Sequence, residues 1–164
     1  MTGRRIVQMA MIVRDLQKSM EEYWGTLGIG PWSVRTFSPE TVKNFTVHGQ
    51  PVKHSFKFLL AGTWVGEVEL ELIQPVQGPT IYESFLERKG EGFHHIKEKV
   101  DDDHIEETLK EFKEKGIEVI QSGRYGDDVF YYLDTEPVLG IIYEIGNVGK
   151  VPPPERLYPP GTEK

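Results

Sequence analysis

Apolar residues follow two different periods along this chain, and glycines and prolines stand where one period gives way to the other. A period of two, as in Val68, Leu70 and Leu72 with glutamates between them, indicates a strand with one apolar face. A spacing of three or four residues, as between Leu16 and Met20, indicates one face of a helix. These periods predict helices over residues 16–27, 81–89 and 104–115, and strands over residues 6–13, 31–37, 52–60, 64–74, 92–100, 117–124, 128–134 and 139–146.

Two segments have neither period. Residues 38–50 contain proline, asparagine and glycine at scattered positions, which predicts a loop or an irregular sheet edge. Residues 148–164 contain five prolines, which predicts an extended arm. This arm is either a poorly ordered terminus, or Leu157 and Tyr158 hold it against the body of the protein or against a second subunit.

The order of the predicted elements repeats: a strand, a helix and three strands, then the same again. The sequence repeats weakly as well, since residues 8–15 align with residues 95–102, and each half ends its first helix at a Gly-Ile pair. We therefore predict an α+β protein of two tandem βαβββ modules, whose curved mixed β-sheets enclose a barrel-like cavity. The expected division is an N-terminal module at 1–76, a linker helix at 77–90, a C-terminal module at 91–147 and a Pro-rich tail at 148–164.

Composition narrows the possible functions. The chain has 164 residues, 38% of them hydrophobic and 27% charged, which excludes an intrinsically disordered protein. It has no cysteine, which excludes a disulfide scaffold, a thiolate zinc site, an iron–sulfur cluster and a cysteine nucleophile. The net charge of −7 argues against a general binder of nucleic acid or of an anionic membrane. No targeting segment or membrane span is recognisable, and the expected location is the cytoplasm.

Four polar residues recur at equivalent places in the two halves. Gln8 and His95 lie in the first strand of each module, and Glu71 and Glu144 lie in the last strand of each. Equivalent positions of a duplicated fold converge near its twofold axis, so we expect these side chains to meet. Oxygen and nitrogen donors of this kind suit a divalent metal such as Co, Mn, Ni, Zn or Fe. The sequence thus predicts a divalent metal ion held by Gln8, Glu71, His95 and Glu144.

Each of the four has a plainer structural explanation. Glu71 belongs to a run of alternating glutamates, which is typical of a solvated sheet face. Gln8 can form hydrogen bonds inside the core, and strict alternation along a strand turns His94 and His95 to opposite faces. A buried single carboxylate is costly, which favours a functional role for Glu144.

Several segments resemble one known family. The stretch from Ile81 to Ile96 with its Gly-Phe-His-His sequence, the Glu71-Leu-Ile-Gln-Pro75 segment and the Gly140-Ile-Ile-Tyr-Glu144 segment are similar to methylmalonyl-CoA epimerases. These epimerases belong to the vicinal-oxygen-chelate superfamily, which also includes glyoxalases, bleomycin resistance proteins and dioxygenases. The resemblance covers about residues 6–146 in the same order along the chain.

The resemblance implies an isomerase or lyase that removes a proton next to a carbonyl group, with the metal stabilising the enolate. It implies Glu144 as an acid–base residue as well as a ligand, and Glu40 as a second carboxylate on the loop after the second strand. The expected substrate is a small carbonyl compound or an acyl-CoA, and the expected assembly is a homodimer. A non-catalytic small-molecule binding protein of the resistance type, and a dioxygenase or glyoxalase-type enzyme, stay as alternatives.

Two departures from the family matter. The resembling epimerases have a histidine where this chain has Gln8. Lys97 and Lys99 share a strand face with His95, so their ammonium groups can pair with glutamates and compete with a metal cation. A lysine desolvated in a cavity can also have a lowered pKa and act as a base, which makes Lys97 a third catalytic candidate.

Overall fold

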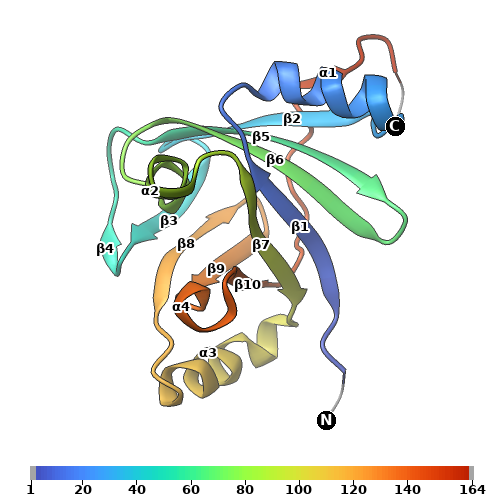
Figure 1. The fold of residues 1–164 in the computed structure, drawn as a ribbon. Coiled ribbons are helices and arrows are strands. Elements are labelled where there is room, and N and C mark those ends of the chain that lie inside the picture. Colours follow the sequence, from blue (N-terminus) through green and yellow to red (C-terminus); the bar gives the residue numbers. More distant parts are fainter. Residues whose placement is uncertain (1–2, 163–164) are drawn as a thin grey trace.

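A computed structural model describes residues 3–162 and shows one large, curved sheet with few helices. The sheet has eleven strands in the order β11-β2-β5-β6-β1-β7-β10-β9-β8-β3-β4, and it is not closed into a barrel (Figure 1). The predicted α+β class with a curved mixed sheet is therefore confirmed. No helix within residues 3–162 is both long enough and apolar enough to cross a membrane.

The two halves have the predicted element order. The first half contains β1 (Ile6–Ile12), α1 (Leu16–Leu27), β2 (Trp32–Phe37), β5 (Lys57–Val65) and β6 (Val68–Gln77). The second half contains β7 (Gly92–Lys99), a short 3-10 turn (Asp102–His104), α3 (Ile105–Glu114), β8 (Val119–Tyr125), β9 (Asp128–Leu133), α4 (Glu136–Leu139) and β10 (Ile142–Gly146). Between them lies α2 (Ile81–Lys89). The expected division into modules at 76, 90 and 147 stays a prediction.

The pairing of the central strands joins the two halves. Strand β1 is antiparallel to β7, and each of these pairs in parallel with the last strand of its own half, β6 or β10. This arrangement places the two first strands side by side at the middle of the sheet, where the approximate twofold axis passes.

The period of two in the strands explains which face of the sheet packs against the helices and which face lines the concave interior. In β6 the leucines Leu70 and Leu72 pack under α1, in a cluster with Met20 and Trp32. The glutamates between them therefore turn to the concave side, and the predicted solvated face is instead the wall of a pocket. Helix α3 covers the second half in the same way, and α2 closes one end of the concave interior with Tyr82 in an aromatic core.

Residues 38–50 are the main difference from the predicted elements. They form β3 (Val42–Val47) and the first residue of β4 (Gln50–Pro51), a hairpin that leaves its own half and pairs with β8. Residues 52–56, predicted to begin a strand, lie outside any strand, and the last predicted strand begins at Ile142 after α4. The hairpin lengthens the curved wall of the second half.

The Pro-rich tail is ordered and crosses from the second half to the first. After β10 it contacts the turn between β8 and β9, where Asp127 N donates to Lys150 O at 2.8 Å. It then forms β11 (Arg156–Tyr158), antiparallel to β2, with Tyr158 against the α1 cluster. Of the two interpretations of the tail, the structure has the one in which Leu157 and Tyr158 hold it against the body.

Asn147 anchors the start of this tail. Its Oδ1 accepts from the backbone N–H groups of Val129 at 3.0 Å and Gly149 at 3.1 Å. Its Nδ2 donates to Asp102 Oδ1 at 2.8 Å and to Asp127 O at 3.0 Å. One side chain thus ties β9, the tail and the turn after β7 together.

We expect Asn147→Ala to lower the free energy of unfolding by about 2–3 kcal/mol, because it leaves two backbone donors and two acceptors without this partner. Urea unfolding followed by tryptophan fluorescence measures the change. Gln17→Ala is the matched control, since the Gln17 amide donates to Glu21 on an exposed helix face, and it should change stability by less than about 0.5 kcal/mol. Equal effects of the two substitutions would contradict the anchoring role.

Candidate active site

A row of polar residues crosses the four central strands. Glu69 of β6 pairs with Gln8 of β1, Gln8 pairs with Lys97 of β7, and Lys97 pairs with Glu144 of β10. Because residues paired across a sheet point to the same side, these four side chains share the concave face. The sheet therefore brings together three of the predicted site residues with one glutamate that the sequence analysis did not single out.

A second row of paired residues lies two residues further along the strands. Comparison of the two rows shows the internal repeat. Ala10 pairs with Glu71 in the first half and with His95 across the centre. In the second half the equivalent pair is Lys97 with Glu144. The same register thus places a small residue beside Glu71 and a lysine beside Glu144.

The concave face is hollowed into a pocket of about 240 Å³ with a small inner cavity of about 30 Å³ behind it. Gln8, Glu71, Lys97 and Asp128 line both, whereas Glu144 lines only the inner cavity. Between them these residues form the polar floor of the pocket.

Lys97 is the centre of the polar floor. Its Nζ lies 3.0 Å from Glu144 Oε1 and 3.2 Å from each carboxylate oxygen of Asp128. Lys97 is only 4% exposed. Burial alone would lower the pKa of this lysine, but the carboxylates of Glu144 and Asp128 outweigh burial and raise it. The direction of this pKa shift favours the charged form of Lys97 over a neutral base, and the catalytic role predicted for Lys97 stays a prediction.

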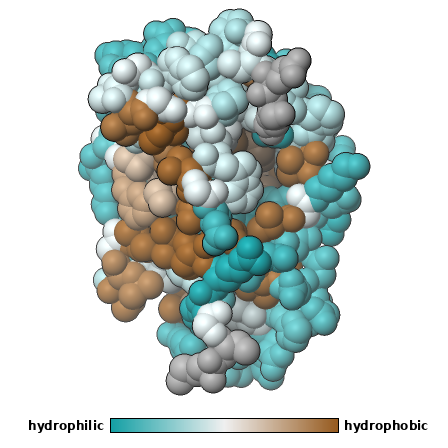
Figure 2. All heavy atoms as spheres, turned by 90° about the vertical axis from the view of Figure 1, so that its right-hand side faces the viewer, coloured by the Kyte–Doolittle hydropathy of each residue, from teal (hydrophilic) through white to brown (hydrophobic). Residues whose placement is uncertain are grey.

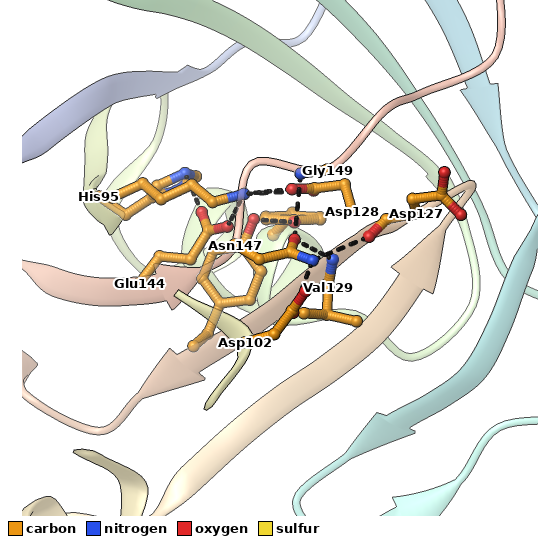
Figure 3. A network of polar contacts seen from close by, with 11 residues as sticks. His95, Asp102, Asp127, Asp128, Val129, Glu144, Asn147 and Gly149 are labelled. Atoms are coloured by element: carbon orange, nitrogen blue, oxygen red, sulfur yellow. Dashed lines mark hydrogen bonds and ion pairs between the residues drawn. The ribbon is translucent and has the colours of Figure 1, made fainter. Parts of the chain in front are cut away.

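Two buried histidines, His94 and His95, lie next to each other near Glu144, and Figure 3 shows His95 beside the Glu144 carboxylate. His95 Nε2 is 3.0 Å from Glu144 Oε2, outside regular hydrogen-bond geometry, and His95 Nδ1 is 2.8 Å from His94 Nδ1. An irregularity in the β1–β7 register at His94 lets both rings turn inward, against the alternation expected from the sequence. Burial lowers the pKa of His94 well below its usual value, so His94 is neutral and can donate from Nδ1 to His95.

The carboxyl groups of the floor differ in their proton affinity. Burial and the nearby Glu69 and Glu144 raise the pKa of Glu71 well above its usual value. Burial also raises the pKa of Asp128, partly offset by Lys97. Burial would raise the pKa of Glu144 as well, but Lys97 and His95 lower it overall. Glu71 is thus the carboxyl group best suited to hold and exchange a proton, and Glu144 is a fixed anion.

Two other residues considered from the sequence lie away from the floor. Glu40 is exposed on the turn between β2 and β3, where it accepts a hydrogen bond from the Ser38 hydroxyl, and it does not line the pocket. Lys99 pairs with Asp101 at 3.7 Å near the surface. The catalytic role predicted for Glu40 stays a prediction.

Several pocket residues carry little or no signal in the sequence. Asp128 lies two residues after Gly126 in a turn-like segment, and its only signal was that it shares a strand face with Phe130 and Tyr132. Arg35 is buried at the pocket wall and donates from Nε to the tail at Pro152 O, 3.2 Å away. No pattern in the sequence marked Arg35, because its neighbours in space come from the tail.

The rim of the pocket is apolar. It is formed by Trp64 on the β5–β6 hairpin and by Val148 and Val151 on the tail, which all line the pocket. Their exposed fractions are 57%, 41% and 37%. Figure 2 shows the face on the right-hand side of Figure 1, on which apolar groups gather between hydrophilic flanks. A ligand of this pocket thus meets apolar groups at the rim and charged groups at the floor.

The four predicted metal ligands do not fit a divalent metal ion as they lie. The Lys97 ammonium stands beside Glu144, and His95 is turned to the other oxygen of the same carboxylate. Across residues 3–162, no three or more histidine, aspartate or glutamate side chains are arranged to hold a metal. A divalent cation next to the ammonium would meet strong repulsion at this distance.

Known proteins of one superfamily are similar to this chain in sequence pattern and in fold. A family model described as the Glyoxalase/Bleomycin resistance protein/Dioxygenase superfamily matches residues 7–132. The fold is similar to that of methylmalonyl-CoA epimerase from Mycobacterium tuberculosis, with 14% identity over 86% of this chain and 85% of that chain and a TM-score of 0.62. No curated protein matches the chain.

Two further solved structures are similar. A Streptomyces coelicolor methylmalonyl-CoA epimerase variant in complex with 2-nitronate-propionyl-CoA is 20% identical over 92% of this chain and 98% of that chain, with a TM-score of 0.64. A methylmalonyl-CoA epimerase in complex with methylmalonyl-CoA and NH4+ is 20% identical over 91% of this chain and 99% of that chain, also with a TM-score of 0.64. At these identities the likeness shows the fold alone. Because the family model spans the chain from β1 into β9, the protein belongs to the glyoxalase/bleomycin resistance protein/dioxygenase superfamily.

Proposed function

We propose that this protein is an isomerase of the epimerase type, which moves a proton at the carbon next to the carbonyl group of a small acyl substrate. The observation that carries the proposal is the polar floor of the pocket. It sets Glu71, a carboxyl group with a raised pKa, near the Lys97 ammonium in a partly enclosed hollow. A proton carrier and a fixed cation are the two groups that the formation of an enolate needs.

The chemistry assigns one task to each side chain. A carboxylate of the floor takes the α-proton, the electron pair of the C–H bond forms a double bond between the α-carbon and the carbonyl carbon, and the π pair of the carbonyl group moves onto its oxygen. An N–H of Lys97 donates to this oxygen as it becomes negative. A carboxylic acid on the other side of the substrate then returns a proton to the α-carbon, which inverts its configuration. Glu71 on β6 and Asp128 on β9 come from opposite halves of the curved sheet and are our candidates for the two proton carriers.

Glu144 has a supporting task in this proposal. Its two oxygens lie at 3.0 Å from Lys97 and from His95, and it lines only the inner cavity. An anion held by two partners in this way is a weak base, so Glu144 positions the ammonium rather than accepting the proton.

The substrate class follows from the pocket and from the relatives. An apolar rim above a charged floor fits a short acyl group whose carbonyl end points inward. The similar epimerase structures contain methylmalonyl-CoA or 2-nitronate-propionyl-CoA, so short 2-substituted acyl-CoA thioesters are the substrates to test first. The homodimer expected from the sequence stays a prediction.

Exchange of the α-proton with solvent tests this function. The wild-type protein is incubated in D₂O with methylmalonyl-CoA and with other short 2-substituted acyl thioesters, and the α-proton signal is followed by ¹H NMR. We expect loss of this signal with at least one thioester at about 10³ times the rate in buffer or more. Binding of the thioesters, detected by saturation transfer, without exchange of any α-proton would instead indicate the non-catalytic binding protein and would overturn the proposal.

A further inference from the structure

We propose that the Lys97 ammonium takes the place of a divalent metal ion in this protein, so that its active site is built to work with a side-chain cation. Members of this superfamily typically bind divalent metals. The inference deepens the proposed function, because it assigns the group that stabilises the enolate. Its test measures metal binding and does not depend on activity.

The internal repeat shows what has changed. Ala10 beside Glu71 and Lys97 beside Glu144 occupy equivalent places in the two halves. With the small residue at both places, the hollow at the axis would be open to a metal ion. The side chain of Lys97 fills this hollow from one side. The residue at this one position therefore determines whether the hollow can take a metal ion or holds a side-chain ammonium.

The contacts of the ammonium are those of a built site. Nζ lies 3.0 Å from Glu144 Oε1 and 3.2 Å from both oxygens of Asp128, and the residue is 4% exposed. Gly146 leaves room for the lysine stem, since a Cβ there would lie 2.9 Å from Lys97 Cε. Figure 3 shows Asp128 and Glu144 converging from neighbouring strands on this point.

The chemistry of the two cations explains why they exclude each other. A metal ion bound to Glu144 needs an oxygen at about 2.0–2.2 Å, and it would then lie next to the ammonium that already pairs with the same carboxylate. Two neighbouring cations repel strongly in a buried site. The ammonium has three N–H donors. One N–H can serve both oxygens of Asp128, which lie at the same distance of 3.2 Å, and a second serves Glu144, so the third can point toward the pocket that Lys97 also lines.

Metal content after exposure to Co²⁺ tests the inference. Wild type, Lys97→Ala and the control Lys99→Ala are incubated with Co²⁺, desalted and measured by elemental analysis and by the visible spectrum of bound Co²⁺. We expect wild type and Lys99→Ala to keep less than about 0.1 Co²⁺ per chain, and Lys97→Ala to keep about one, because Gln8, Glu71, His95 and Glu144 are then free to bind it. The control removes a lysine from the same strand face but outside the pocket.

Removing Lys97 leaves two carboxylates unpaired and can prevent folding. The double variant Lys97→Ala/Asp128→Asn removes one of these charges and keeps all four predicted ligands, so it provides the same readout in a folded protein. One Co²⁺ per chain in the wild type would overturn the inference, and so would folded variants that bind no more Co²⁺ than the wild type. Either result leaves the α-proton exchange of the wild type to decide the proposed function by itself.

Discussion

Replacing Glu71 by glutamine is expected to lower the rate of α-proton exchange by about 10²- to 10⁴-fold, the usual contribution of one proton-transfer group. Glutamine has nearly the same shape but can neither take nor return a proton. Burial and the neighbouring Glu69 raise the pKa of Glu71 well above its usual value, which suits proton exchange. The rate is measured by ¹H NMR in D₂O with the thioester that the wild type exchanges best.

The matched control is Glu67→Gln, which removes a glutamate from the same alternating run but at an exposed position. It should leave the exchange rate within about twofold of the wild type, because it changes only long-range charge. If both variants exchange at the wild-type rate, Glu71 is not the proton carrier.

The same substitution has a pH-dependent effect on stability. An acid whose pKa is higher in the folded state holds more protons when folded, so its contribution to stability is lost as the pH rises from the unfolded pKa through the folded pKa. Glu71→Gln removes this loss. The stability of the variant relative to the wild type should therefore rise as the pH is raised above the ordinary carboxyl pKa, as measured by urea unfolding. A variant that becomes relatively less stable over this range would contradict the raised pKa.

The internal repeat explains why so much of the site was predictable. The apolar and polar periods place Gln8 and His95 in the two first strands and Glu71 and Glu144 in the two last strands. The observed pairing of Ala10 with Glu71 and of Lys97 with Glu144 has the same register in both halves. A duplicated strand order fixes which positions share a row, so local patterns were enough to find the rows.

Long-range contacts limited the prediction elsewhere. Strand β3 contains a positive backbone φ angle at Asn44 and pairs with β8 of the other half, which no local period can indicate. The inward turn of His94 depends on an irregularity in the register with β1. Asp128 and Arg35 belong to the pocket only because the sheet curves and the tail crosses it.

The alternation in β7 predicted that Lys97 faces the site but left open what the lysine does there. Whether a buried lysine is a base, a metal competitor or a fixed cation depends on the charges that surround it. Here the carboxylates of Glu144 and Asp128 surround Lys97 and favour its charged form. Asp128 lies too far from Lys97 along the chain for this ion pair to be predicted from the sequence.

Replacing Glu144 by glutamine is expected to lower the free energy of unfolding by about 3–5 kcal/mol, the cost of breaking a buried ion pair from one side. The change leaves the buried Lys97 with Asp128 as its remaining ion-pair partner and removes the anion beside His95. Urea unfolding near neutral pH measures the loss. Glu136→Gln is the control, because Glu136 pairs with Arg88 and Lys89 near the surface, and it should cost at most about 1 kcal/mol.

Acid and a double variant separate the ion pair from simple packing. The pKa of Glu144 is lowered in the folded state, so its stabilisation is complete above the unfolded carboxyl pKa and is lost as the pH falls through the folded pKa. The difference between wild type and Glu144→Gln should therefore shrink in acid. In a cycle with Lys97→Met and Glu144→Leu, the double variant should lose less stability than the two single variants together, by about 1–3 kcal/mol. Additive losses, or a difference that does not change with pH, would show that Glu144 acts through packing and does not hold the ammonium in place.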